Sequence, residues 1–270
     1  MKILVTGGSG FLGQALLSRL NGDIRIVARD EGDLVMTKQR FPLVEIVTGD
    51  ISDKFISKKI LKDVDIVYHL AAFKHVGLAE QQSYQCVNTN LIGTMNLLNY
   101  FQGQTFLAIS TDKAAQVTGV YGATKLLMER LIAEYEKLNS DIKYRVVRYG
   151  NVLYSTGSVL VKWKKILQEG GELIVTEPNA TRYFWTINEA IDLIEDCLEN
   201  ATSSSPYCPE MKSIKIADLL EAMQVKYGRA SSIKVIGLQK GENFHEKILE
   251  QGTHSGECER YNINEIMEMI

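Results

Sequence analysis

The sequence predicts an α/β protein in which a doubly wound parallel sheet is joined to a smaller, mixed region of helices and strands. Three observations lead to this fold class. Short apolar runs alternate with longer segments of helical spacing over roughly the first 170 residues. The runs lack the polar alternation of half-exposed strands, as expected where both faces of a parallel sheet are buried. The length of 270 residues allows one large domain with an appendage.

The strands of this sheet are predicted from six apolar runs. They are Ile3–Val5, Ile24–Val27, Val44–Val47, Ile66–Leu70, Phe106–Ile109 and Tyr144–Val147. Two of the intervening segments, Tyr84–Tyr100 and Tyr121–Leu138, are predicted to be long helices. In the second helix, Leu127, Leu131 and Ile132 recur near one face and leave the charged residues for solvent. Strands and helices that alternate at this interval form right-handed β–α–β units.

After Tyr149 the alternation becomes irregular, and we expect a domain boundary near residue 150. Residues 1–150 are predicted to form the sheet domain, and residues 151–270 a smaller region that is interleaved with it and packs over one edge of the sheet. In chain order this region is predicted to contain a helix, a strand, a helix, a loop, a helix, a strand and a polar tail. These are Val159–Gln168, Leu173–Thr176, Asn188–Leu198, Thr202–Pro209, Ile216–Gln224, Ile233–Ile236 and Gly252–Ile270.

The composition argues against several classes of partner. Thirty basic and thirty-three acidic residues give a net charge of −3, which does not favour binding to nucleic acid or to an anionic membrane. No signal peptide is recognisable, and no apolar stretch reaches the roughly 20 residues of a membrane-spanning helix. The four cysteines and four histidines show no metal-ligand spacing. We therefore expect a cytoplasmic protein with reduced cysteines and no metal site.

A glycine motif between the first strand and the first helix predicts a Rossmann-like dinucleotide site. Gly7, Gly10 and Gly13 have the spacing G-x-x-G-x-x-G, with Phe11 and Leu12 inside the motif. Glycine permits the tight turn and the close approach of backbone to a pyrophosphate, and the following helix directs its positive end at the phosphates. The alternative is a plain glycine turn without a ligand.

The end of the second strand bears on the choice between NADP and NAD. An acidic residue at this position binds ribose hydroxyls, whereas an arginine accommodates a 2′-phosphate. Arg29 comes directly after the strand and before Asp30, so NADP is favoured. In the alternative, Arg29 is solvated and Asp30 binds the ribose of NAD. Asp50 and Ile51, after the third strand, are candidates to frame the adenine, with a loop-capping Asp50 as the alternative.

The reactive groups are predicted at the end of the fifth strand and in the helix that follows it. Tyr121 and Lys125 are four residues apart and share one helix face. A free tyrosine has a pKa near 10, and an ammonium beside it, together with a positive nicotinamide, favours the phenolate that can act as a base. A hydroxyl from Ser110 or Thr111 would hold the substrate oxygen.

With these motifs the chain resembles the extended short-chain dehydrogenase/reductases. Within them it is similar to the inverting UDP-N-acetylglucosamine 4,6-dehydratases, which act in bacterial surface-polysaccharide pathways. The resemblance covers nearly the whole chain and implies a lyase that uses NADP, acts on UDP-N-acetylglucosamine and forms homo-oligomers through the two long helices. Beyond the glycine motif, it is carried by Ala71–Val76, Thr89-Asn90, Ser110–Lys113, Tyr121–Lys125, Arg148–Val152, Gly157-Ser158, Thr181-Arg182, Ser213–Ile216 and Gly241–Glu246.

The resemblance also implies catalytic roles. Tyr121 would take the proton of the sugar 4-hydroxyl while NADP accepts the hydride, Lys113 would abstract the carbon 5 proton, and Asp112 would protonate the departing 6-hydroxyl. An epimerase or reductase, the first rival, needs only the tyrosine, Lys125 and Thr111. In the structural alternative Asp112 caps the next segment and Lys113 is a surface lysine. Retaining relatives tend to carry methionine at the position of Tyr121, so inversion at carbon 5 is favoured.

Binding roles follow from the same resemblance. Ala71 and Ala72 are implied on the cofactor side, and Arg182 is the candidate clamp for a diphosphate, because a guanidinium matches phosphate oxygens in a fork. The residues implied on the substrate side are Lys74, Asn90, Asn151, Arg182 and Glu242. Alternatively, Asn90 bridges backbone groups and Lys74 is a solvated loop residue.

Two departures from the family pattern leave the exact sugar open. Gln239 and Thr156 stand where relatives carry arginine, which removes positive charge from the expected phosphate site. The carbon 5 configuration and a reaction that stops at a 5,6-unsaturated sugar are left open as well. A second rival is a non-catalytic NADP-binding regulator, against which the intact pair of Tyr121 and Lys125 argues.

Overall fold

The computed structural model describes residues 1–230 and 232–270, and within them a six-stranded parallel sheet forms the centre of the molecule. Its strand order is β3-β2-β1-β4-β5-β6, the doubly wound order, so the predicted fold class is confirmed. The strands are β1 (Lys2–Thr6), β2 (Asp23–Ala28), β3 (Glu45–Thr48), β4 (Ile66–His69), β5 (Thr105–Thr111) and β6 (Lys143–Tyr149).

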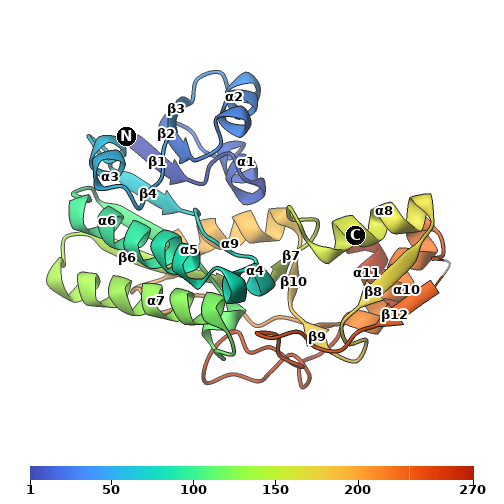
Figure 1. Ribbon diagram of the computed structural model, residues 1–270. Coiled ribbons are helices and arrows are strands. Elements are labelled where there is room, and N and C mark those ends of the chain that lie inside the picture. The colour runs from blue at the N-terminus through green and yellow to red at the C-terminus, as the bar shows by residue number, and fades with distance from the viewer. Residues whose placement is uncertain (231) are drawn as a thin grey trace.

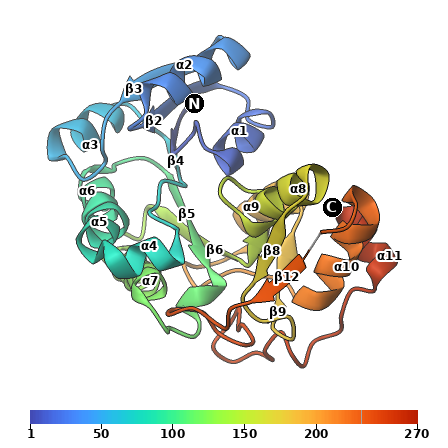
Figure 2. The same cartoon turned by 45° about the vertical axis from the view of Figure 1, so that its right-hand side comes forward.

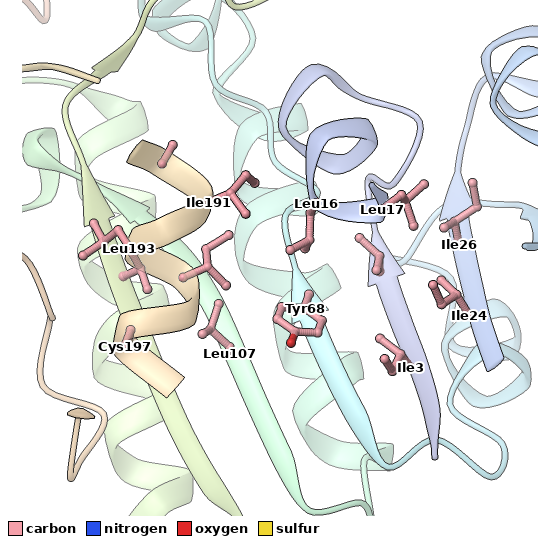
Figure 3. Packing of buried hydrophobic residues seen from close by; sticks show 14 of the residues in the cluster. Ile3, Leu16, Leu17, Ile24, Ile26, Tyr68, Leu107, Ile191, Leu193 and Cys197 are labelled. Atoms are coloured by element: carbon pink, nitrogen blue, oxygen red, sulfur yellow. The ribbon is translucent and has the colours of Figure 1, made fainter. Parts of the chain in front are cut away.

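Helices cover both faces of the sheet (Figure 1). One layer consists of α1 (Phe11–Leu17), α2 (Glu31–Arg40) and α9 (Ile187–Asn200), and the other of α3 (Lys54–Ile60), α6 (Gly93–Tyr100) and α7 (Val120–Leu138). Figure 3 shows the first layer, where Leu16 and Leu17 of α1 and Ile191 of α9 lie over Tyr68 and Leu107 of the strands. Because the strands are apolar on both faces, each layer buries a separate core.

The predicted helix over Tyr84–Tyr100 is present without a break but is not a regular α-helix throughout. The chain forms α4 (Val76–Gln81) and α5 (Ser83–Val87), then a π-helical turn (Asn88–Ile92), and only then α6. The wider turn is of the kind often found at functional sites, and it carries the buried residues Thr89 and Asn90. The extent of the helical segment was predicted, but its irregular hydrogen bonding was not.

The second region stands beside the carboxyl ends of the strands (Figure 2). Short strands pair β7 with β10, β9 with β11, and β8 with β12. Its own core includes Trp163, Leu219 and Ile266. The elements are β7 (Asn151–Val152), α8 (Val159–Glu169), β8 (Glu172–Val175), β9 (Thr181–Arg182), β10 (Phe184–Trp185), β11 (Ile214–Lys215), α10 (Ile216–Tyr227), β12 (Ser232–Val235) and α11 (Ile263–Met269).

Two helices after residue 150, α9 and α11, have places that a separate polar appendage would not have. Helix α9 returns to the sheet, where Ile191, Ile194 and Cys197 join the core of the first domain. The predicted polar tail contains α11, which packs on α10 through the fully buried Ile266. In residues 1–230 and 232–270, no helix is both long and apolar enough to cross a bilayer.

Candidate active site

A cavity of about 740 Å³ lies at the carboxyl ends of the strands, between the sheet and the second region. This is where doubly wound sheets bind ligands, because the connections on either side of the switch point between β1 and β4 separate there. The glycine motif, Arg29 and Tyr121 all border the cavity. Trp163 and Arg182 border the part formed by the second region.

The glycine motif forms a turn in which Gly7 and Gly13 leave no room for a side chain. Gly7 has φ +69°, and a Cβ there would meet the backbone of Ala71 at 3.0 Å. A Cβ on Gly13 would lie 2.5 Å from the Gly7 carbonyl oxygen, so the first turn of α1 can pack against the loop only without a side chain. Gly10 is the N-cap of α1 and offers no side chain to its first turn, which leaves amide groups facing the cavity.

The residues at the end of β2 have separate surroundings. The Asp30 carboxylate accepts a hydrogen bond from the Asp33 backbone N–H at 2.9 Å and caps α2. Arg29 is exposed and borders the cavity, with its guanidinium 3.9 Å from Asp50. Asp50 itself accepts a hydrogen bond from the Ser52 backbone N–H, so it also organises its own loop. Of the two side chains that follow β2, Asp30 is hydrogen-bonded as a helix cap, whereas Arg29 makes only a long ion pair and is freer to contact a ligand.

Two buried hydroxyls that border the cavity fit a bound dinucleotide. Thr89 Oγ1 and Ser110 Oγ have no hydrogen-bond partner among the described residues, although both residues are buried. A buried polar atom without a partner costs about 1–3 kcal/mol, which a polar ligand would relieve. Together with the glycine turn and the cavity-lining Ala71 and Ala72, these atoms make the site compatible with a nicotinamide dinucleotide.

The chain turns sharply after β5 and places Asp112 beside Lys113. Asp112 Oδ1 accepts hydrogen bonds from Thr111 Oγ1, from the Lys113 backbone N–H and from Lys113 Nζ, each at 2.9 Å. Asp112 is fully buried and does not border the cavity, whereas Lys113 and Thr111 do. Lys113 is therefore no surface lysine: Asp112 positions its ammonium at the wall of the cavity.

Tyr121 and Lys125 border the cavity, but their electrostatics differ from the prediction. Burial raises the pKa of Tyr121 to about 12, opposed by the Lys113 ammonium and by a hydrogen bond with the Thr111 hydroxyl. Lys125 Nζ donates to the Ile109 carbonyl oxygen at 2.6 Å, and burial lowers the pKa of this lysine to about 8. Lys113 is thus a cation that favours the Tyr121 phenolate in this structure.

Glu246 is a site residue that we did not single out from the sequence. Its side chain is 1% exposed and borders the cavity. Its Oε1 lies 3.7 Å from Lys113 Nζ and 3.7 Å from Arg182 Nε. The block Gly241–Glu246 was recognised as a family marker, and the two carboxylates within it were the available signal.

The predicted substrate residues separate into two groups. Lys74, Asn151, Arg182 and Glu242 all border the cavity. The Arg182 guanidinium is partly engaged, because Nη1 donates to the carbonyl oxygens of Thr181 and Phe244 at 2.9 and 3.0 Å. Loss of solvent in the cavity wall lowers the pKa of Lys74.

Asn90 has a different place from the predicted one. It is 1% exposed and does not border the cavity. Its Oδ1 accepts from the Phe73 backbone N–H at 2.8 Å, and its Nδ2 donates to the Phe73 carbonyl and to Thr124 Oγ1. Asn90 therefore bridges the loop after β4 to α7, as the alternative interpretation expected, and the structure does not bring it to the cavity with the other predicted substrate residues.

The arrangement combines a titratable hydroxyl, an ammonium held by a buried carboxylate, and a second carboxylate that borders the cavity. Tyr121 can exchange a proton with a substrate hydroxyl, and Lys113 can exchange one with a carbon acid. Among the residues that the structure describes, no group of three or more histidine, cysteine, aspartate or glutamate side chains is placed to hold a metal ion. The proton-transfer groups present suit chemistry at a carbon next to a carbonyl.

Comparison with known proteins identifies the relatives of this chain. The family described as "Polysaccharide biosynthesis protein" matches residues 3–268. An uncharacterized membrane protein of Methanocaldococcus jannaschii is 36% identical over 99% of this chain and 84% of its own length. A UDP-N-acetylglucosamine 4,6-dehydratase (inverting) of Campylobacter jejuni is 34% identical over 92% and 77%. A UDP-glucose 4-epimerase of Rickettsia canadensis is 30% identical over the same shares.

Solved structures share the fold. The structure of Pen from Bacillus thuringiensis superposes with a TM-score of 0.87 at 29% identity and covers 92% of this chain and 80% of that chain. The dTDP-glucose 4,6-dehydratase DesIV from Streptomyces venezuelae, solved with NAD and TYD bound, superposes with a TM-score of 0.83 over all of this chain and 95% of that chain. At 18% identity, the likeness to DesIV shows the shared fold.

Proposed function

The chain belongs to the polysaccharide biosynthesis protein family of extended short-chain dehydrogenase/reductases, and from this premise we propose that it is a nucleotide-sugar dehydratase. Its proposed substrate is UDP-N-acetylglucosamine, and its proposed product is a UDP-4-keto-6-deoxy sugar with inverted configuration at carbon 5. The Campylobacter jejuni relative with this activity supports the choice of substrate. The inverted configuration rests on the tyrosine at position 121.

One observation carries the proposal: the pair of Asp112 and Lys113 lies beside Tyr121, with Lys113 Nζ held at 2.9 Å from Asp112. Proton exchange at the 4-hydroxyl alone needs only the tyrosine. Loss of water across carbons 5 and 6 also needs a base at carbon 5 and an acid at the departing hydroxyl. In this proposal Lys113 supplies the base and Asp112 supplies the acid. An epimerase needs neither of these two groups.

The chain's residues have distinct tasks in the proposed reaction. The glycine motif would hold NADP, which would supply the hydride acceptor for carbon 4 and the hydride donor for carbon 6. Tyr121 takes the proton of the 4-hydroxyl, and Thr111 holds the oxygen. Lys113 removes the carbon 5 proton, which the neighbouring ketone acidifies, and Asp112 gives a proton to the hydroxyl that leaves carbon 6. Each proton-transfer group typically contributes 10²–10⁴-fold to the rate.

The test is incubation of the protein with UDP-N-acetylglucosamine and NADP in heavy water, followed by mass spectrometry and NMR. We expect the loss of one water per sugar, deuterium at carbon 5 and no net consumption of cofactor. A deuterium label placed on carbon 4 is expected in the new methyl group of the product. Unchanged sugar, or a product without the label, would contradict the dehydratase.

A UDP-sugar 4-epimerase is the second candidate, and the Rickettsia canadensis relative favours it. An epimerase would change the configuration at carbon 4 without loss of water, and carbon 5 would keep its hydrogen in heavy water. A reductase would instead consume NADPH in proportion to product. The same incubation therefore separates all three activities.

We propose NADP as the cofactor, with Phe11, Leu12, Asp50, Ile51 and the glycine motif at the site. The exposed Arg29 at the cavity supports this choice, because the neighbouring Asp30 carboxylate is engaged in capping α2. Calorimetric titration is expected to give tighter binding of NADP than of NAD. An Arg29→Ala variant is expected to lose about 1.5–3 kcal/mol of NADP binding, typical of a charged hydrogen bond, with NAD binding unchanged. Equal losses for the two cofactors would refute a 2′-phosphate contact.

We also propose that the chain forms homo-oligomers through the helical segments 83–100 and 120–138. Several large apolar side chains of these segments are exposed in the single chain. They are Tyr84, Val87, Ile92, Met95, Leu127 and Leu138. Exposed apolar side chains gathered on neighbouring helices are typical of association surfaces.

A further inference from the structure

Glu246 is a buried carboxylate at the cavity wall to which the proposed reaction gives no task. Its Oε2 accepts a hydrogen bond from Asn243 Nδ2 at 3.0 Å, and its backbone N–H donates to Ser255 Oγ at 2.9 Å. Its Oε1 lies 3.7 Å from Lys113 Nζ and 3.7 Å from Arg182 Nε. The carboxylate is therefore held in place, but its contacts with the two cations are longer than hydrogen bonds.

The cluster favours a negative charge on Glu246. Burial raises the pKa of this carboxyl, and the positive charge of Lys113 is the main effect that opposes it, with Arg182 acting in the same direction as Lys113. Two cations at 3.7 Å stabilise the ionised form of a carboxyl group. Glu246 therefore adds a fixed negative charge to the wall of the cavity.

The charges of the cluster leave Glu246 unbalanced once a nucleotide sugar is bound. Lys113 is already paired with Asp112, whose Oδ1 lies 2.9 Å from Nζ. Arg182 borders the cavity and is the candidate clamp for a diphosphate, so a bound nucleotide engages its positive charge. Of these four charged groups, Glu246 is then the carboxylate without a cation of its own.

This excess negative charge bears on the group that a sugar carries at carbon 6. A hydroxymethyl group is neutral, and its hydroxyl is the one that a dehydration removes. A carboxylate at carbon 6 would be repelled by Glu246, and charges at a buried wall are only weakly screened by salt. At an effective dielectric constant of about 20, two like charges about 6 Å apart repel enough to change a binding constant tenfold or more.

We propose that Glu246 is a specificity-determining residue whose charge lets the cavity accept nucleotide sugars with a hydroxymethyl group at carbon 6 and reject those with a carboxylate there. This inference rests on the proposed dehydratase function, which places carbons 5 and 6 beside Lys113. No bond forms or breaks at Glu246. The residue acts against a competing substrate by repulsion of like charges, which is one of the two ways in which a site achieves specificity.

The experiment is a calorimetric titration with UDP-glucose and UDP-glucuronate, which differ only in the group at carbon 6. The protein is loaded with NADPH, which cannot accept a hydride, so the sugars are not consumed. Wild type is expected to bind UDP-glucuronate at least about tenfold more weakly than UDP-glucose. In Glu246→Gln, the ratio of the two dissociation constants is expected to fall by about tenfold. A change in diphosphate binding at Arg182 affects both sugars alike and cancels in this ratio.

Two control variants separate the charge of Glu246 from its shape and from the net charge of the protein. Glu246→Asp keeps the carboxylate and is expected to keep the rejection of UDP-glucuronate. Glu257→Gln removes a carboxylate that is exposed and paired with His254, and it is expected to keep the wild-type ratio. Thermal unfolding shows which variants fold. If Glu246→Gln does not fold, Glu246→Asn is the second neutral variant, with the same expected result.

Two results would overturn the inference. One is equal binding of the two sugars by wild type, and the other is a neutral variant that folds and keeps the wild-type ratio, since rejection would then depend on shape. Dehydration of UDP-N-acetylglucosamine is measured separately. If wild type dehydrates this sugar and either result is found, the inference falls while the proposed function stands. If wild type leaves the sugar unchanged, the proposed function falls, and the binding ratios still decide the inference.

Discussion

His69 illustrates how buried hydrogen bonds set a protonation state next to the cofactor loop. Thr94 Oγ1 donates to the Asn90 carbonyl, so His69 Nε2 donates to Thr94 Oγ1 at 2.8 Å. Thr6 Oγ1 accepts from the backbone N–H groups of residues 70 and 71 and is left to donate to His69 Nδ1. The ring is therefore held neutral, and burial, assisted by the positive charge of Lys125, lowers the pKa of His69 to about 3.

This state predicts a pH dependence of stability. An unfolded histidine titrates near 6.5, so between about pH 6.5 and 3 the unfolded chain binds a proton that the folded chain does not. The stabilisation is present above pH 6.5 and is lost as the pH falls toward 3, at up to about 1.4 kcal/mol per pH unit. Urea unfolding at pH 7 and pH 5 measures it. His69→Gln is expected to be less stable at pH 7 and to show a smaller difference between the two pH values; an equal difference would contradict a buried neutral ring.

At the scale of elements, the contact between the glycine loop and α1 decides whether a pyrophosphate can approach the backbone. A methyl group on Gly13 would meet the Gly7 and Gly8 carbonyl oxygens at 2.5 and 2.6 Å, and backbone atoms cannot rotate away as a side chain does. The loop and the helix would have to separate. The three glycines thus determine the loop geometry as well as the room for a ligand.

Gly13→Ala is therefore expected to weaken NADP binding at least about tenfold, because the helix moves away from the phosphate position. Gly77→Ala is the matched control: Gly77 lies in α4, and a Cβ there meets nothing within 4 Å. That exchange is expected to keep binding and to stabilise the helix by up to about 1 kcal/mol. Calorimetric titration and thermal unfolding measure the two effects. Equal binding by the two variants would show that the loop tolerates the methyl group.

At the scale of the molecule, the carboxyl-terminal segment is attached to the sheet domain through Arg148 of β6. This side chain is fully buried, and its Nε and Nη2 donate to both oxygens of Glu129 in α7 at 2.8 and 2.6 Å. Its Nη1 donates to the Ile248 carbonyl at 2.9 Å, and both terminal nitrogens contact Glu250. The same segment carries Glu246 to the cavity, so this anchor places a site residue that is distant in sequence.

Arg148→Met is expected to lower the free energy of unfolding by about 3–5 kcal/mol, because it leaves the buried Glu129 without its partner. Glu250→Gln is the control: its carboxylate is 44% exposed, so its loss is expected to cost less than about 1 kcal/mol. Urea unfolding followed by circular dichroism compares them. A small loss in Arg148→Met would show that the two parts of the molecule do not depend on this anchor.

Oligomerisation is also a property of the whole molecule. Wild type is expected to run as a dimer or a larger assembly in size-exclusion chromatography with light scattering. A glutamate at Leu127, whose side chain is 51% exposed on α7, is expected to shift the population to monomers. Leu43→Glu is the control, because Leu43 is 94% exposed but lies outside the proposed surface. A monomeric wild type would refute the proposed association.

The sequence by itself determined the order of strands and helices, the glycine loop and the pairing of Tyr121 with Lys125 on one helix. These depend on contacts between residues close in the chain, where periodicity and glycine spacing are direct physical signals. The tertiary structure decided which residues distant in sequence are neighbours in space. It turned Asn90 inward, engaged Asp30 in a helix cap, placed the Lys113 cation beside Tyr121 and brought Glu246 across more than a hundred residues to Lys113. Burial and charge at such a meeting point come from several segments at once, so no local pattern encodes them.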